Sequence, residues 1–377
     1  MYDKPKKKDG EGGGFSNLLK TFVPQKGDVP FELARKSVFC GSLLICLVAL
    51  IAIIIAAAAS GNKEEEIITV SAWSGFIDGS VSIAPLPELP VQQILERVRL
   101  DDPDMAAAYE INNDVVGWIH IPGTVLDNPV LQYPHLRYEE FGVEKFGNEY
   151  YLHRDINHNW FYDGVIFADV NAPVLGERRP GNIILYGHNL LNRTMFRQAA
   201  LYWPYFGGRS NIDFYRENPV VHFDTLYERG VYKVFAVGLF HTEDPDNIRR
   251  GIAHDVYNYH RIRNFPDRDA FYDFIVNILD RSGFYNPDVD LMYGDEIITL
   301  STCYYPLGEH IDTRIAVFAR RVRDGESPVV DIDAAWLNPN PHYFDHYYNV
   351  RGGSWGGRNW DTSKVAGLDE WLTARGE

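Results

Sequence analysis

The chain has 377 residues, of which 45% are hydrophobic, so it can bury a full core and global disorder is excluded. Its formal net charge of −16 at pH 7 disfavours nonspecific nucleic-acid binding, because such binding needs clustered Lys and Arg side chains to displace counterions. Nucleic acid is therefore not an expected partner.

An uncharged apolar run, VFCGSLLICLVALIAIIIAAAA, occupies residues 38–59. A helix needs about 20 such residues to cross a bilayer, so we predict a transmembrane signal anchor at residues 37–60. Lys and Arg precede the run and three glutamates follow it. The positive-inside rule then predicts a short disordered cytoplasmic tail at residues 1–36 and an extracellular remainder, which makes this a single-pass protein of the cell membrane. A cleaved signal peptide is the alternative, but the run is too long and begins too late for one.

The segment that follows the apolar run predicts a spacer and then the start of a folded domain. Residues 61–90 end in the Pro-spaced sequence IAPLPELP, which is typical of a semi-rigid extracellular stalk. From residue 91 to 112, apolar residues recur at helical spacing with an interruption at Pro103, which predicts one or two helices. Residues 113–133 alternate apolar and polar side chains between turn residues, as consecutive short strands do.

Three further segments continue the strand pattern: NEYYL at 148–152, GVIFADVNAP at 164–173 and GNIILYGHN at 181–189. In the last of them the apolar run ends at Gly187, so we expect His188 at a strand end where a loop opens. Imidazole is the side chain best suited to pass a proton near neutral pH. Because the chain has 12 histidines, an inert histidine is the alternative for any single one of them.

Residues 267–281, DRDAFYDFIVNILDR, place apolar side chains at the i, i+3, i+4, i+7 spacing of an amphipathic helix. Asp267 is a suitable N-cap for this helix, and Ser282 with Gly283 is a suitable stop. We therefore predict a helix here that packs its apolar stripe against the domain.

Two β-rich runs, EIITLST and TRIAVFARRV, follow that helix and predict Cys303 at the end of one strand and Arg314 at the start of the next. Cys40 and Cys46 lie inside the apolar run, so Cys303 has no partner for an intramolecular disulfide outside the membrane. An odd cysteine in an oxidising compartment is an intermolecular link or a reactive group. A guanidinium can stabilise the reactive thiolate form. A buried structural cysteine beside a surface arginine is the alternative.

The sequence TLSTC with Arg314 in the next strand, together with YGHN around His188, resembles the active-site signature of the sortases, the cysteine transpeptidases of Gram-positive cell surfaces. The strands DVVGWI and TVLDNPVLQ and the helix at 267–281 are similar to class B of that family. The resemblance covers residues 91–323. It implies a mainly β fold, a sortase-like closed β-barrel with N-terminal helices and a helix inserted before the cysteine strand.

By this resemblance, Cys303 attacks the backbone carbonyl after Thr in a sorting motif, and an amine resolves the thioacyl enzyme. His188 moves the proton, and Arg314 with backbone N–H groups holds the oxyanion. The resemblance also implies residues that line the substrate groove or shape the strand end next to it, namely Asn148, Leu152, Tyr186, Ser301 and Thr302. A structural role, as a turn former, a core residue or a packing residue, stays open for each of these five.

The resemblance implies exported proteins with a C-terminal sorting motif as substrates, with an NPxT-like motif favoured. The amine is expected from a peptidoglycan precursor or from a pilin lysine, so wall anchoring and pilin polymerisation are both possible outcomes. No cofactor is implied, and no metal site is predicted, since the chain lacks an acidic calcium-type cluster. A cysteine hydrolase resolved by water and a noncatalytic surface-binding protein are the two rival functions.

Residues 324–377 lie beyond the resemblance. They contain Trp336, Trp355, Trp360 and Trp371 and the Gly-rich sequence RGGSWGGRNW, a composition too aromatic for a plain flexible tail. Large aromatic side chains usually contribute by burial, so packing on the barrel is favoured over contact with glycan, and no functional role is predicted for this extension.

Overall fold

A computed structural model describes residues 102–176, 178–243, 245–252 and 255–376. The predicted cytoplasmic tail, signal anchor and stalk lie outside these residues, as does the first part of the predicted helical segment at 91–112. Across the described part of the chain, no helix combines the length and the apolar composition that crossing a bilayer requires.

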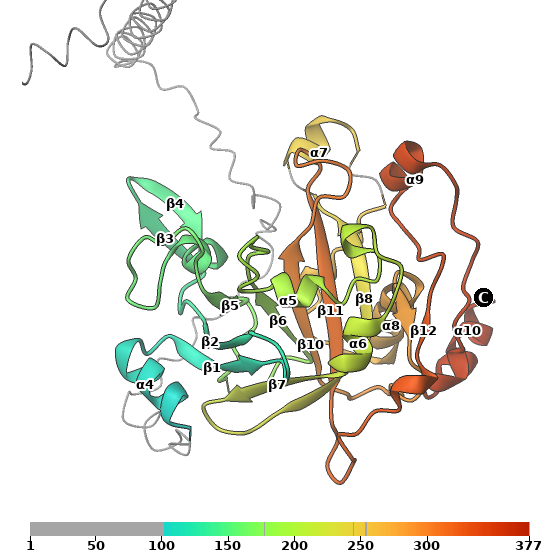
Figure 1. The fold of residues 1–377 in the computed structure, drawn as a ribbon, viewed down its shortest axis with the longest axis horizontal. Coiled ribbons are helices and arrows are strands. Elements are labelled where there is room, and N and C mark those ends of the chain that lie inside the picture. The colour runs from blue at the N-terminus through green and yellow to red at the C-terminus, as the bar shows by residue number, and fades with distance from the viewer. Residues whose placement is uncertain (1–101, 177, 244, 253–254, 377) are drawn as a thin grey trace, which may run out of the picture. The chain divides into compact units, whose positions relative to one another are not determined.

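Eight strands close into a barrel in the order β1-β2-β5-β6-β10-β11-β8-β7 (Figure 1). Their bounds in chain order are β1 Val115–His120, β2 Asp127–Leu131, β5 Ile166–Ala168, β6 Asn182–Tyr186, β7 Val220–Thr225, β8 Val231–His241, β10 Ile297–Cys303 and β11 Thr313–Arg321. The pairs β2–β5 and β6–β10 are parallel, and the other neighbours are antiparallel. The prediction of a closed, mainly β barrel is confirmed.

Smaller elements surround the barrel. The other strands form two short pairs, β3 Arg137–Glu140 with β4 Val143–Phe146 and β9 Phe284–Tyr285 with β12 Trp336–Leu337. Among the described residues, the α-helices are α4 Pro103–Ile111, α5 Arg197–Ala200, α6 Asp213–Glu217, α7 Pro245–Arg249, α8 Arg268–Asp280, α9 Asp345–Arg351 and α10 Leu368–Arg375. The 3-10 turns of this part of the chain are η2 Gly147–Glu149, η3 Tyr151–His153, η4 Phe206–Gly208, η5 Tyr259–Arg261, η6 Ile332–Ala334 and η7 Thr362–Lys364.

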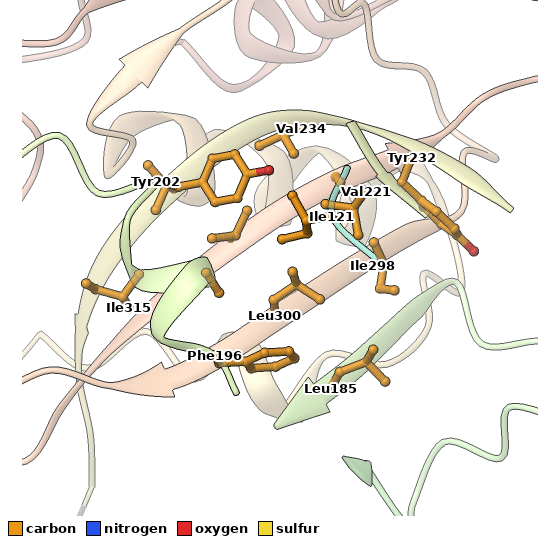
Figure 2. Close-up of a cluster of buried hydrophobic side chains, with 14 of the residues drawn as sticks. Ile121, Leu185, Phe196, Tyr202, Val221, Tyr232, Val234, Ile298, Leu300 and Ile315 are labelled. Carbon is orange, nitrogen blue, oxygen red and sulfur yellow. The ribbon is translucent and has the colours of Figure 1, made fainter. Parts of the chain in front are cut away.

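The barrel interior is filled by apolar side chains from alternate positions of its strands (Figure 2). Ile298 and Leu300 of β10 and Ile315 of β11 are fully buried there. Because successive side chains of a strand point to opposite faces, the residues between them face outward. Ser301 and Cys303 on β10 therefore share the outer face of the barrel.

The predicted helix at 267–281 is present as α8. The side chain of its N-cap Asp267 accepts a hydrogen bond of 2.8 Å from the backbone N–H of Ala270. Phe274 and Ile278 of α8 pack in one cluster with Phe318, which lies on the outer face of β11. The helix thus covers part of the outer surface of the barrel, as its apolar stripe predicts.

The prediction that NEYYL at 148–152 is a strand is wrong, because this segment forms the two 3-10 turns η2 and η3. The rings of Tyr150 and Tyr151 both contact Tyr133, with ring centroids 4.0 and 6.5 Å away. Adjacent side chains of a strand point to opposite faces and cannot converge in this way. Tertiary packing of the aromatic rings therefore overrides the β propensity of the tyrosines.

The C-terminal extension packs on the outside of the barrel. Its strand β12 pairs with β9, and the indole N–H of Trp360 donates a hydrogen bond of 2.8 Å to the Asp280 carboxylate at the end of α8. Val365, Leu368 and Leu372 join the apolar cluster that α8 forms. Figure 1 shows the extension, in orange and red, running past β12 from α9 to α10.

Candidate active site

Cys303 and Arg314 are direct partners across the antiparallel pair β10–β11. Cys303 is the last residue of β10, is partly exposed and carries a free thiol. Its backbone carbonyl accepts a hydrogen bond of 2.8 Å from the side-chain amide of Asn189. The end of the cysteine strand is thus held in place while the thiol stays accessible.

The Arg314 guanidinium is buried at 6% residue exposure and donates hydrogen bonds to the Asp312 carboxylate and, at 3.0 Å, to the Thr313 carbonyl. Burial alone would lower the pKa of Arg314, but negative charge on Cys303 and Asp312 outweighs it and raises that pKa overall. The guanidinium is therefore permanently charged, and it stands beside the sulfur with its orientation set by Asp312.

His188 follows β6, the strand on the other side of β10. Ser301 pairs with Tyr186 in the parallel register, so Cys303 and His188 lie two residues beyond this pair on the same outer face. The Thr302 hydroxyl donates a hydrogen bond of 2.7 Å to the Gly187 carbonyl and ties the two strand ends together. The structure thus brings the three residues predicted to be catalytic to one place, with Cys303 between the other two.

The imidazole of His188 has a defined tautomer. Its Nε2 lies 2.9 Å from the Leu152 carbonyl, which can only accept, so Nε2 carries the proton and Nδ1 is the basic nitrogen of the neutral ring. Burial lowers the pKa of His188, with His153 and Arg314 acting in the same direction, while the Leu152 hydrogen bond and Asp163 oppose it. The ring is consequently neutral near pH 7 and able to accept a proton.

Three further residues of the site were not predicted from the sequence. Tyr305 hydrogen-bonds to Cys303 through its hydroxyl, and burial followed by the charge of Cys303 raises the pKa of this tyrosine. Asp312 orients Arg314, and Asn189 holds the Cys303 carbonyl. Sequence signals existed for all three: Tyr305 lies two residues after the cysteine, Asp312 lies two before the arginine, and Asn189 is next to His188.

Of the five residues predicted to contact substrate, Leu152 reaches the site through its carbonyl, and Thr302 is buried between the two strand ends. Ser301 is also buried, and its Oγ lies 2.7 Å from the Tyr259 hydroxyl. These three residues border His188 and Cys303, with Ser301 lying under Tyr259. Their roles in substrate binding stay predictions.

Asn148 and Tyr186 belong instead to a buried polar cluster around Asp169. Asp169 accepts hydrogen bonds from the Tyr186 hydroxyl at 2.9 Å, from the Asn148 amide at 3.2 Å and from the Arg263 guanidinium at 3.1 Å. Burial works to raise the pKa of Asp169, but Arg263 outweighs it and lowers that pKa overall. In the structure, both residues satisfy a buried carboxylate, which corresponds to the structural alternative left open above.

Within the described residues, no group of three or more His, Cys, Asp or Glu side chains is arranged to hold a metal ion.

No family model matches the chain. A Staphylococcus aureus protein named sortase B is 28% identical over 221 residues, which is 59% of this chain and 75% of that protein. A Listeria monocytogenes protein named sortase B is 27% identical over 194 residues, which is 52% of this chain and 64% of that protein. Both alignments leave more than a third of this chain unmatched.

Solved structures that resemble the chain include a Staphylococcus aureus sortase B–substrate complex, which is 28% identical with a TM-score of 0.46 and covers 62% of this chain and 89% of that chain. A Clostridium perfringens sortase B structure is 25% identical with a TM-score of 0.43 and covers 58% of this chain and 99% of that chain.

Proposed function

Since the protein is a sortase most similar to class B, we propose that it is a cysteine transpeptidase in which Cys303 is the nucleophile, His188 the proton carrier and Arg314 the oxyanion-binding cation. The observation that carries the proposal is the position of Cys303 between His188 and Arg314 on one outer face of three neighbouring strands. A nucleophile needs both groups within reach, and sequence similarity alone says nothing about that arrangement.

The first half-reaction forms a thioacyl enzyme. Neutral His188 takes the proton of the Cys303 thiol. The thiolate then attacks the backbone carbonyl carbon of Thr in the sorting motif, so that the motif is cut after this residue. The oxyanion lies against the Arg314 guanidinium, which is charged throughout and is held by Asp312. When the tetrahedral intermediate collapses, the C–N bond breaks and the departing amine takes the proton from His188.

The second half-reaction transfers the acyl group to an amine. The incoming amine gives a proton to His188 and attacks the thioester carbon, and the C–S bond breaks as the new amide forms. His188 then returns the proton to the sulfur, so the enzyme ends as it began. Water can replace the amine in the same geometry and hydrolyse the thioacyl enzyme. A cysteine hydrolase is therefore the second candidate function.

The proposed substrates are exported proteins with a C-terminal sorting motif of the NPxT type, and the proposed acceptor is an amine of a peptidoglycan precursor. A pilin lysine as acceptor would make the enzyme a pilin-polymerising sortase. We further propose that residues 37–60 anchor the chain in the cell membrane with the barrel outside the cell, because the apolar run and the charges that flank it support that topology.

Intact-mass measurement of the full chain in detergent tests the proposal. The chain is incubated with NPxT-type and LPxT-type peptides, with and without an added amine. We expect a covalent peptide adduct on the wild-type chain, ligated product only when amine is present, and neither with Cys303→Ala. Cleavage without amine capture would assign the hydrolase. An unmodified protein with every peptide, or product formation by Cys303→Ala, would contradict the proposal.

A further inference from the structure

We propose that residues 338–351, here called the C-terminal strap, are a positioning element of the active site. In this proposal, the strap holds the loop between β10 and β11, residues 304–312, against the end of the barrel and so keeps Cys303 and Arg314 in register. The inference rests on the function proposed above, and it assigns a role to a segment for which the sequence predicts none. We call residues 304–312 the Cys–Arg loop.

The Cys–Arg loop controls the site because a site residue borders it at each end. It begins directly after Cys303 and ends two residues before Arg314. It also carries Tyr305, which hydrogen-bonds to the sulfur, and Asp312, which orients the guanidinium. Any shift of this loop therefore changes the distances between the thiol and the groups that stabilise its charged form.

The strap contacts this loop directly. The guanidinium of Arg351, at the end of α9, donates a hydrogen bond of 2.9 Å to the Pro306 carbonyl. Tyr347 of the strap and Tyr304 and Leu307 of the loop all pack against the same barrel core, and Tyr347 is close enough to Tyr304 to act on its pKa. The Tyr347 ring also stacks on Tyr343, with ring centroids 3.9 Å apart. One hydrogen bond and one pair of neighbouring tyrosines thus connect the strap to the loop.

The strap is fixed to the body of the protein at other points. Asn338 is fully buried and donates hydrogen bonds to the Ser282 carbonyl at 2.7 Å and to the Tyr285 hydroxyl at 2.8 Å. Phe344 is buried and stacks on His241 with ring centroids 4.6 Å apart, at the end of β8, the strand that pairs with β11. A segment anchored at both points can hold a loop in place.

The contact between strap and loop adds little to the buried core. α9 contains no buried residue, and Arg351 itself is exposed. Surface hydrogen bonds of this kind contribute little net stability. Substitution of Arg351 should therefore change the placement of the loop without unfolding the protein, which separates positioning from general packing.

The test uses Arg351→Ala and Tyr347→Ala in the full chain. The rate constant of Cys303 alkylation by iodoacetamide is measured at fixed pH without substrate, and kcat and KM are measured with the peptide and amine that the wild type uses. If the loop moves, the sulfur changes its distances to Arg314 and Tyr305, so the alkylation rate constant should change about threefold or more. We expect kcat to fall about five- to tenfold with KM nearly unchanged.

Two matched variants complete the test. Arg351→Lys keeps a donor for the Pro306 carbonyl and should recover most of the wild-type profile. Trp371→Ala removes a hydrogen bond to Asp269 in α8, far along the extension from the strap, and should lower Tm without changing the alkylation rate constant. The inference is overturned if Arg351→Ala and Tyr347→Ala both alkylate like the wild type, or if Trp371→Ala changes the rate constant equally. The alkylation measurement tests the role of the strap even if the wild type ligates no peptide.

Discussion

The strands β6, β10 and β11 present two different chemistries on their two faces. Toward the interior they show apolar side chains that are completely buried, such as Leu185, Ile298 and Ile315 (Figure 2). Toward the outside, near the ends of the same strands, they carry the thiol of Cys303 and the guanidinium of Arg314, and each of these has specific partners in the structure.

The difference shows that stability and reactivity depend on different kinds of contact. Each fully buried aliphatic side chain contributes about 1.5–3 kcal/mol by leaving water, whichever apolar neighbours it meets. A polar contact on the outer face contributes about 1 kcal/mol net, but its direction decides which atom meets the substrate. Substitutions on the inner face should therefore affect folding, and those of the polar residues at the outer strand ends should affect turnover.

Replacement of Cys303 by alanine is the most severe test of this separation. We expect ligation to fall roughly 10⁴-fold or more, because no other group near the site can form the thioester. The strand end is still held by the Asn189 contact to the backbone carbonyl, so Tm should change by only about 2–4 °C. Ligation assays and thermal melts on the same samples measure both effects. Residual turnover above background would reject the role of the thiol.

Leu300→Ala tests the inner face instead of the outer one. Leu300 directly precedes Ser301 on β10, and its side chain points into the barrel. Leu300 is completely buried, so we expect the free energy of unfolding to fall by about 2–5 kcal/mol through lost apolar burial and a residual cavity. Urea denaturation measures this loss. Activity per folded molecule should remain within about threefold of wild type. A large loss of kcat in the folded fraction would mean that the two faces are coupled.

Arg314→Lys tests the outer face without removing its charge. The ammonium of lysine cannot reproduce the planar donors that contact Asp312 and the Thr313 carbonyl. We expect kcat to fall about 100-fold, or about 2.7 kcal/mol, with KM little changed, since the lost contact is made mainly to the oxyanion. Asp312→Asn, which keeps the arginine but weakens its orientation, should give a smaller loss of the same kind. Wild-type turnover in the lysine variant would show that charge alone suffices.

Local patterns could predict much of this site. Alternation along TLSTC and TRIAVF places Cys303 and Arg314 at the facing ends of one strand pair, and the structure has them as direct partners. The position of His188 could be predicted only from the resemblance of its sequence to a known motif. The strands β6 and β10 are far apart in the sequence, and no local pattern indicates that they pair. Apolar spacing likewise predicted α8 to within a residue or two.

Long-range polar contacts could not be predicted in this way. The partner of Asp169 is Arg263, which lies in a loop without periodic pattern, so nothing indicated that Asn148 and Tyr186 would point into a buried cluster. The contact between Arg351 and Pro306 has the same character, since it joins the end of the short helix α9 to an irregular loop. Side chains that satisfy one another across the fold leave no periodic signal in the sequence.

The smallest expected effect concerns His153, which stacks on His188 with ring centroids 5.3 Å apart. Charge repulsion from His153 lowers the pKa of His188, as Arg314 does, whereas Asp163 and the Leu152 carbonyl act in the opposite direction. His153→Gln removes one of the two opposing positive charges. The pKa of His188 should then rise toward its ordinary value of about 6.5.

The sign of the change in activity follows from the role of His188 as a base. Neutral His188 accepts the thiol proton, so kcat/KM is lost as pH falls through the pKa of this residue. Burial puts that acidic limb below about pH 6.5 in the wild type, and His153→Gln should move it upward. The variant should therefore be about two- to threefold less active near pH 6 and equal to wild type near pH 8. An acidic limb that stays in place would show that His153 packs on His188 without tuning it. A basic limb that moves to higher pH instead would show that the reactive form is the imidazolium.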